Sequence, residues 1–283
     1  MKRFFKYLTL LLCAGLLFVL VGTLFLWHTE ESETHKMIDA LKTPVTGHEI
    51  TPKTTLALDQ LFFNAEIDSV PRLFLTNFPA DFPEKGNPVL FAKALTPLIL
   101  RANEQALKER AILKILAHKN QFNQPWTLKE NLFFNQMLQK YDCVLFKTRD
   151  TQLNELLIKV DEVPVSLAVI QAGLQTDWGR QNLKSPFGEK IWFDRSTYAD
   201  QQFDTLMDAT DSYILSLNAT IPYYQWRMGR QLLKPLDYKT RGSAFAGLLS
   251  AYNPDDKQYT QKLMSFYRQT RLITLDQARF RPE

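Results

Sequence analysis

Apolar and polar positions divide the chain into one uninterrupted apolar segment and several amphipathic ones. Residues 7–27 carry no charged side chain, and their 21-residue length matches the roughly 20 residues that cross the hydrocarbon core of a bilayer. Lys2, Arg3 and Lys6 precede this segment. Because positively charged flanks stay in the cytoplasm, we expect a cytoplasmic tail over 1–6, a transmembrane signal anchor over 7–27 and export of the rest.

A removed signal peptide is the alternative to an anchor. Its apolar region would be shorter and would end in a cleavage site of small residues, whereas residues 24–26 run directly into Trp27. The sequence therefore favours an anchor that stays attached. Residues 28–66 follow as a solvated tether, because Pro44 and Gly47 are among the residues that interrupt any regular period there.

Helical spacing begins after the tether. Asn87 and Pro88 are typical of a helix start, with the asparagine as N-cap and the proline at the first helical position. Apolar residues then recur on one face over 91–116. Pro97 predicts either a kink in this helix or its real start. We therefore expect residues 67–146 to be a mainly helical part of the folded domain.

A second helix is expected where the sequence reads KVDEVPVSLAVIQAGLQTDWG, residues 159–179. Pro164 signals its start, and Gly179 is a natural C-terminal stop. Apolar residues spaced to face a core form a stripe at Val163, Leu167, Ile170, Leu174 and Trp178. Gln171 and Gln175 occupy a different face, which we expect to line a groove.

Composition and charge exclude several classes of function. The formal net charge is +4, but the first six residues supply three of these charges, so no basic surplus is left to favour nucleic-acid binding. Cys13 and Cys143 stand far apart and the four histidines are scattered without a ligand motif, so we expect neither a metal site nor a cofactor. Glu104 and Lys108 form an i,i+4 pair, which indicates a solvated helix face.

The run over residues 159–179 resembles a known family. It is similar to the pattern R/K-V-D-x-I/V-P-x-S-L-A-x-x-Q-A-A-x-E-S-G-W-G of the bacterial Bax-type glucosaminidase domain, which is related to the family-73 glycoside hydrolases. Further matches, in the same order along the chain, are Val70, Pro71, Arg72, Leu98, Ile99, Leu100, Asn103, Glu104, Tyr213, Leu217, Asn218, Tyr223, Arg227, Arg230, Gly247, Leu248, Tyr252 and Tyr259. The resemblance covers residues 67–276.

The resemblance implies a mainly α-helical, lysozyme-like domain with at most a small β-hairpin near residues 187–200. The glucosaminidase-like core would span 147–283, after the helical part over 67–146. Family members cut β-linked N-acetylglucosamine in peptidoglycan, so peptidoglycan glycan strands are the expected partner. Together with the anchor, this implies a single-pass protein of the bacterial inner membrane with its C-terminal domain in the periplasm.

The resemblance also places the catalytic group. The family's general acid is the glutamate of E-S-G-W-G, and alignment on Trp178 and Gly179 puts Gln175 at that position. A carboxamide cannot deliver a proton to the leaving glycosidic oxygen, so the exchange removes general-acid catalysis, a contribution of roughly 10²–10⁴-fold. Glu189 is the preferred substitute acid because it follows the family's Phe-Gly pair, and Asp177 is a weaker candidate because it lies about 200° around a helix from residue 175.

Aromatic and polar residues near this helix are the expected sugar contacts. The substrate-binding set implied by the resemblance is Gln171, Trp178, Phe187, Gly188, Trp192, Tyr252 and Tyr259, whose aromatic members suit the C–H faces of pyranose rings. Two functions stay open. One is a periplasmic glucosaminidase that works through a relocated acid, and the other is a non-catalytic glycan-binding or scaffold protein of the cell envelope.

Overall fold

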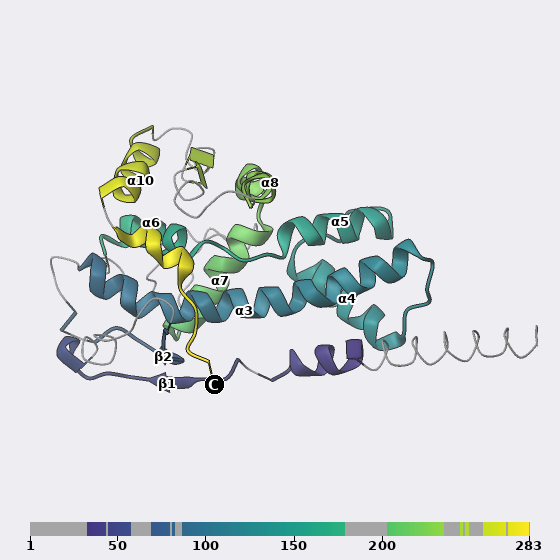
Figure 1. Cartoon of the computed structure of the whole chain (residues 1–283), viewed down its shortest axis with the longest axis horizontal. Coiled ribbons are helices and arrows are strands. Elements are labelled where there is room, and N and C mark those ends of the chain that lie inside the picture. Colours follow the sequence, from purple (N-terminus) through teal and green to yellow (C-terminus); the bar gives the residue numbers. More distant parts are fainter. Residues whose placement is uncertain are drawn as a thin grey trace, which may run out of the picture.

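The computed structural model describes residues 33–43, 45–57, 69–79, 81–82, 87–178, 203–234, 244–245, 247–248, 257–269 and 271–282 (Figure 1). Helices make up 68% of it and strands 4%, which confirms a mainly α fold. The elements in chain order are β1 (His48–Ile50), β2 (Leu73–Leu75), α3 (Pro88–Gln121), α4 (Leu128–Lys140), α5 (Arg149–Lys159), α6 (Val165–Thr176), α7 (Leu206–Ala219), η1 (Ile221–Tyr223), α8 (Tyr224–Leu233), α10 (Lys257–Gln269) and η3 (Arg271–Gln277). A further helix covers residues 33–40.

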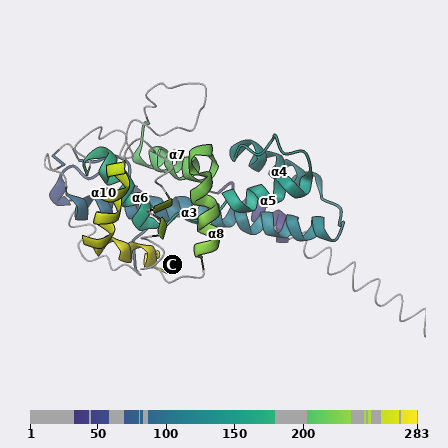
Figure 2. The same cartoon turned by 90° about the horizontal axis from the view of Figure 1, so that it is seen from above.

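Helix α3 runs through the middle of the molecule, with α5, α6 and α7 packed against it and α10 packed on α6 (Figures 1 and 2). Its start is the one that the sequence predicts. The Asn87 side chain accepts hydrogen bonds from the backbone N–H groups of Val89 and Leu90, at 3.1 and 3.0 Å, and Pro88 is the first helical residue. Pro97 lies inside the helix, so the alternative that it marks the start is wrong.

Two apolar clusters divide α3 between them. Around its N-terminal half, Phe91, Leu95 and Leu98 pack against side chains of α6, α7 and α10. Around its C-terminal half, Ile112 and Leu113 pack against side chains of α4 and α5. Full burial of an apolar side chain of this size contributes about 1.5–3 kcal/mol, so the two clusters stabilise the packing of α5, α6 and α7 on α3.

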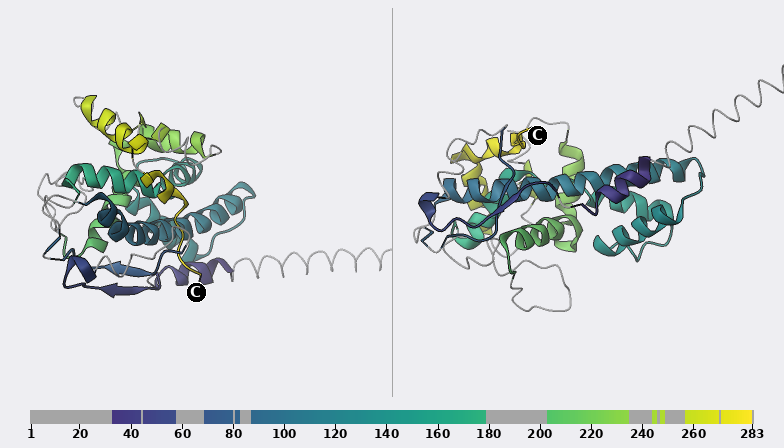
Figure 3. Two further views of the ribbon diagram at one scale, coloured as in Figure 1. Left: turned by 60° about the vertical axis from the view of Figure 1, so that its left-hand side comes forward. Right: turned by 90° about the horizontal axis from the view of Figure 1, so that it is seen from below.

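Residues 33–57 belong to the folded domain, whereas a solvated tether was the expectation for this stretch. In the helix over 33–40, Ile38 is only 6% exposed and joins the second apolar cluster. Strand β1 then pairs in parallel with β2 beside α3, with His48 opposite Leu73 (Figure 3). The segment folds because its apolar side chain finds a cluster to join and its backbone groups find partners in a strand.

The anchor expected over 7–27 and the hairpin expected near 187–200 lie outside the described residues. Within the described part of the chain, no helix combines the length and the apolar character needed to cross a bilayer. The strands described there are the parallel pair β1–β2, and an isolated bridge joins Val70 to Phe280. This bridge brings the C-terminal end of the chain beside the start of the region that carries the resemblance.

Candidate functional site

Helix α6 carries the position at which the sequence places the catalytic group. It begins at Val165 without a side-chain cap of its own, and the backbone N–H of Ser166 donates to the Asp276 carboxylate of η3 at 2.8 Å. A carboxylate at this end also suits the positive end of the helix dipole. The helix ends at Thr176, two residues earlier than a stop at Gly179 predicts.

Two residues in left-handed conformation follow the last turn of α6. Asp177 is the C-cap with φ 49°, and Trp178 has φ 58°. Residues other than glycine rarely adopt such values, and a bulky aromatic residue does so least readily. Because the helix has already ended, the direction of the Asp177 side chain is set by this turn and not by the 200° rotation assumed for a continuing helix.

Helix α6 is buried on its apolar face and also at Gln171, on the face that the sequence predicts to line a groove. The apolar stripe is confirmed at Val163, Leu167 and Ile170, which are at most 1% exposed. Gln171, on the face expected to line a groove, is also 0% exposed, and its Oε1 accepts a hydrogen bond from the Tyr213 hydroxyl. The structure therefore places Gln171 in the core, and this burial opposes its expected role in substrate binding.

Trp178 is likewise a core residue. Its ring is 7% exposed and lies between Phe91 and Phe266, with centroid distances of 5.9 and 5.1 Å. A Cβ at Gly173 would lie only 2.3 Å from this ring, so the helix needs a glycine at that position. Burial of this kind opposes the expected role of Trp178 as a sugar platform.

The other predicted site residues lie at the edge of the described structure or beyond it. Gln175 is in the last turn of α6 and Tyr259 is in α10, but the side chains of both fall outside what is described. Fully outside the described residues are Phe187, Gly188, Glu189, Trp192 and Tyr252. Their placement beside residue 175 stays a prediction.

A buried arginine holds the segment that leads into α6, residues 158–163. The Arg230 side chain is 2% exposed and comes from α8. Its guanidinium donates hydrogen bonds to the carbonyl oxygens of Ile158, Lys159 and Glu162 and to Oδ1 of Asn218, at 2.9, 3.0, 3.1 and 2.7 Å. Burial lowers the pKa of Arg230 to about 9, against the opposing effect of Asp161, so the group keeps its charge at neutral pH.

Two asparagines complete this hold on the segment. The Asn103 side chain of α3 donates to the carbonyl of Val163 at 2.7 Å and accepts from the Val163 N–H at 2.8 Å. The Asn218 amide of α7 donates to the carbonyl of Asp161 at 2.9 Å. Arg230, Asn218 and Asn103 are all residues that carry the resemblance, so their described contacts give them a common task, which is to position α6.

The Asp161 carboxylate lies in the segment that leads into α6. It is 1% exposed, with Lys234 and the Gln231 amide in hydrogen-bonding contact and the Arg110 guanidinium at 3.6 Å. Burial raises the pKa of Asp161, but the positive charges of Arg230, Lys234 and Arg110 lower it by more than burial raises it. The pKa of Asp161 therefore lies below its ordinary value. A carboxyl that is ionised in this way cannot serve as a general acid near neutral pH.

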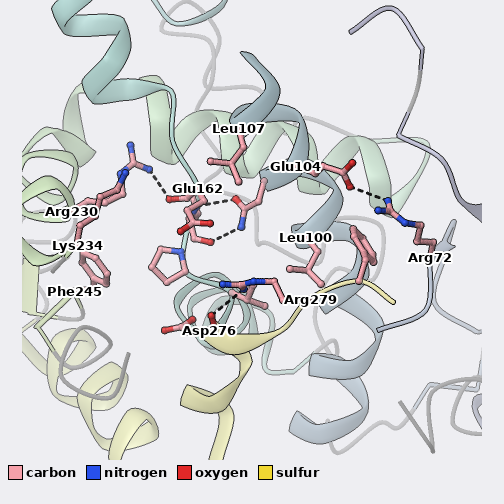
Figure 4. Close-up of a pocket in the computed structure, with 15 residues that line it drawn as sticks. Arg72, Leu100, Glu104, Leu107, Glu162, Arg230, Lys234, Phe245, Asp276 and Arg279 are labelled. Atoms are coloured by element: carbon pink, nitrogen blue, oxygen red, sulfur yellow. Dashed lines mark hydrogen bonds and ion pairs between the residues drawn. The ribbon is translucent and has the colours of Figure 1, made fainter. Parts of the chain in front are cut away.

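A cavity of about 490 Å³ opens beside the N-terminal end of α6 (Figure 4). Val165 lines it, whereas residue 175 lies ten positions further on, about 15 Å along the helix axis. On one wall Arg72 contacts Glu104 at 2.9 Å, and on the other Arg230 and Lys234 lie near Glu162 (Figure 4). This cavity is therefore a different place from the groove expected at the C-terminal end of the helix.

Glu104, at the mouth of this cavity, is an ion-pairing residue. It also contacts Lys108 at 3.1 Å, which confirms the predicted i,i+4 pair. Burial raises the pKa of Glu104, but the hydrogen bonds from Arg72 and Lys108 lower it to a net value below its ordinary one. Within the described residues, no group of three His, Cys, Asp or Glu side chains could hold a metal ion.

The fold and the site define a mainly helical protein in which an arginine and two asparagines position the buried helix α6. No family profile and no solved structure matches the chain. Among curated proteins, it is 25% identical to Protein bax of Escherichia coli strain K12, over 72% of this chain and 75% of that protein. This similarity supports a bacterial Bax-type protein, in agreement with the resemblance read from the motifs.

Proposed function

We propose that this chain is a membrane-anchored protein of the cell envelope whose glucosaminidase-related domain binds peptidoglycan glycan strands and hydrolyses them weakly or not at all. The observation that carries the proposal is the glutamine at position 175, in the last turn of α6. The resemblance places a general acid there. A carboxamide can hydrogen-bond a glycosidic oxygen but cannot protonate it.

Three described acids near the N-terminal end of α6 have roles in the fold that leave them no part in general-acid catalysis. Asp161 and Glu104 both have a pKa below the ordinary value, because cations contact them, so neither holds a proton near neutral pH. Asp276 is committed to the backbone N–H of Ser166. These carboxylates stabilise the fold at the opposite end of the helix from residue 175.

The proposed location rests on the sequence of the N-terminal region. The uncharged segment 7–27 follows three basic residues, which favours a single span with the domain on the periplasmic side. A periplasmic domain held at the inner membrane has peptidoglycan within reach. Location and partner therefore agree with each other.

The second candidate function is a glucosaminidase that works through a relocated acid. Glu189 is its favoured acid, because it directly follows Phe187 and Gly188 in a loop that the resemblance places beside the groove. A protein nucleophile would not be needed if the N-acetyl group of the substrate attacked, as in substrate-assisted glycosidases. One carboxyl group would then suffice.

Muropeptide analysis separates the two functions. The full chain, purified in mild detergent, would be incubated with insoluble peptidoglycan, and the sediment and the soluble fragments would be measured. We expect the unaltered protein to sediment with peptidoglycan and to release no new reducing ends. Robust release by the unaltered protein, abolished by Glu189→Gln but retained by Glu49→Gln, an exposed glutamate of β1, would establish the enzyme instead.

The Gln175→Glu variant adds a test in which only restored cleavage is informative. The two side chains are nearly isosteric, so we expect the fold to be kept. Cleavage that appears only in this variant would show that the groove still positions the sugar and lacks just the acid. Lys184, Ser185 and Pro186 differ from the family pattern nearby, so restored cleavage is expected to be small.

A further inference from the structure

Exposed apolar side chains are most frequent in the part of the chain that runs from the end of α3 to the start of α5. Thirteen large apolar residues are exposed among the described residues, and six of them fall within the 25 positions from 122 to 146. We call these six the apolar tip: Phe122, Leu128, Leu132, Val144, Leu145 and Phe146. Leu145 is 85% exposed and Leu128 is 77% exposed. Such a concentration on a folded domain marks a surface that meets something other than water.

The structure presents the loop part of this tip in a defined conformation. Cys143 is completely buried, and its backbone N–H donates to the carbonyl of Leu138 at 2.8 Å. On the other side, the Gln152 side chain donates to the carbonyl of Phe146 at 3.0 Å. These two hydrogen bonds fix both ends of the loop over residues 144–146. The fold therefore keeps the side chains of the loop exposed.

The chain enters the domain at this same end. The helix over 33–40 lies against the start of α4, where His35 contacts the Thr127 hydroxyl at 2.9 Å and Asp39 pairs with Lys129 at 2.5 Å. Figure 1 shows this helix next to α4, with α5 at the same end of the molecule. The proposed anchor ends at Trp27, and six residue steps span at most about 20 Å. The end that carries the apolar tip therefore lies close to the membrane surface whenever the anchor is inserted.

We infer that the apolar tip rests on the periplasmic surface of the bilayer that holds the anchor, with its side chains in the lipid headgroup region. This inference depends on the proposed anchor. Asp142 and Lys147 flank the loop with opposite charges, so the apolar side chains supply the attraction and a particular lipid charge is not required. Lipid is the occupant that the anchor brings within reach of this surface.

A fluorescent probe at the tip tests the contact in the full chain. Leu145→Cys would be combined with Cys13→Ser, labelled with an environment-sensitive iodoacetamide and reconstituted into phosphatidylethanolamine–phosphatidylglycerol vesicles. Cys143 stays because it is buried, and burial raises the pKa of its thiol to about 11, so it reacts little at neutral pH. The matched control is Val89→Cys, 61% exposed and about 48 Å from the far end of α3.

We expect the probe at 145 to shift to shorter wavelength and to lose emission when the vesicles contain a headgroup-level lipid quencher, while the probe at 89 does neither. Leu128→Cys is the second tip position, should Leu145→Cys fail to fold. The protein could float with the vesicles and resist alkaline extraction while the probe at 145 stays unquenched. This result would overturn contact of the apolar tip with lipid but would still support the anchor. Protein that does not float with vesicles overturns both.

Two further outcomes would also overturn the inference. Equal quenching at 145 and 89 would mean that the domain lies flat on the bilayer without a preferred end. A wavelength shift at 145 that occurs without lipid quenching and grows with protein density would assign the apolar tip to contact with a second copy of the chain.

Discussion

Replacing Arg230 with methionine is expected to destabilise the fold through the segment that leads into α6. Methionine keeps most of the length and apolar stem of arginine but removes every donor. The carbonyl oxygens of residues 158, 159 and 162 and the Asn218 side chain would each lose a hydrogen bond at 3.1 Å or less. These acceptors are buried or half-buried, so water cannot fully replace the guanidinium.

The size of the loss follows from these four contacts. A hydrogen bond to a charged group contributes about 1.5–3 kcal/mol, but simple addition overstates the effect, because the native state also carries the desolvation of the guanidinium. The lowered pKa of Arg230 is the sign of that desolvation. Loss of one partner in a buried ionic network costs about 3–5 kcal/mol, and we expect Arg230→Met to fall in this range.

Urea unfolding of the full chain in detergent, followed by far-ultraviolet circular dichroism, measures the change. Arg279→Met is the control, because Arg279 is exposed and donates only to the nearby carbonyls of Asp276 and Ala278. We expect the control to change the free energy of unfolding by no more than about 0.5 kcal/mol. Equal effects of the two substitutions would refute the role given to Arg230.

Three further predictions follow from individual contacts. Gly173→Ala should lower the free energy of unfolding by about 1–3 kcal/mol, as measured by urea unfolding. Alanine has the better helix propensity, but its Cβ would collide with the Trp178 ring. Cys143 should resist iodoacetamide at pH 7.5 until urea unfolds the chain, since burial raises its pKa to about 11; mass spectrometry reads the alkylation. Asp161 has a lowered folded pKa, so its stabilising effect is present above about pH 4 and is lost as the pH falls through the folded value. Removing one cation with Lys234→Met should therefore move the acid-unfolding midpoint, followed by circular dichroism, to higher pH.

Local patterns were sufficient to predict where two of the main helices, α3 and α6, lie. The Asn87–Pro88 start of α3 depends on neighbouring residues alone, and the structure has it at that position. The apolar stripe of α6 is likewise a local property, and it is buried as expected. Such features follow from spacing and capping, which a single sequence displays directly.

Burial of the second face of α6 could not be predicted in this way. Gln171 is polar and stands off the stripe, so helical spacing alone predicts a surface position. It is buried because Tyr213, 42 positions later in the chain, supplies a hydroxyl to its side-chain oxygen. The tether that the sequence predicts over 28–66 is wrong at residues 33–57 for the same reason, since the partners of Ile38 and β1 lie far away in sequence.

The contacts of the motif residues bear on what the similarity to Protein bax can mean for this chain. Asn103, Asn218 and Arg230 bind the backbone of the segment before α6, and none of these contacts involves the residue at 175. A buried helix without a side-chain cap of its own needs such support whether or not it carries an acid. The resemblance at these positions is therefore explained by the placement of α6, whereas the proposed loss of the general acid concerns position 175. These contacts are therefore compatible with the proposed protein, in which glutamine stands at the general-acid position while the support of α6 is kept.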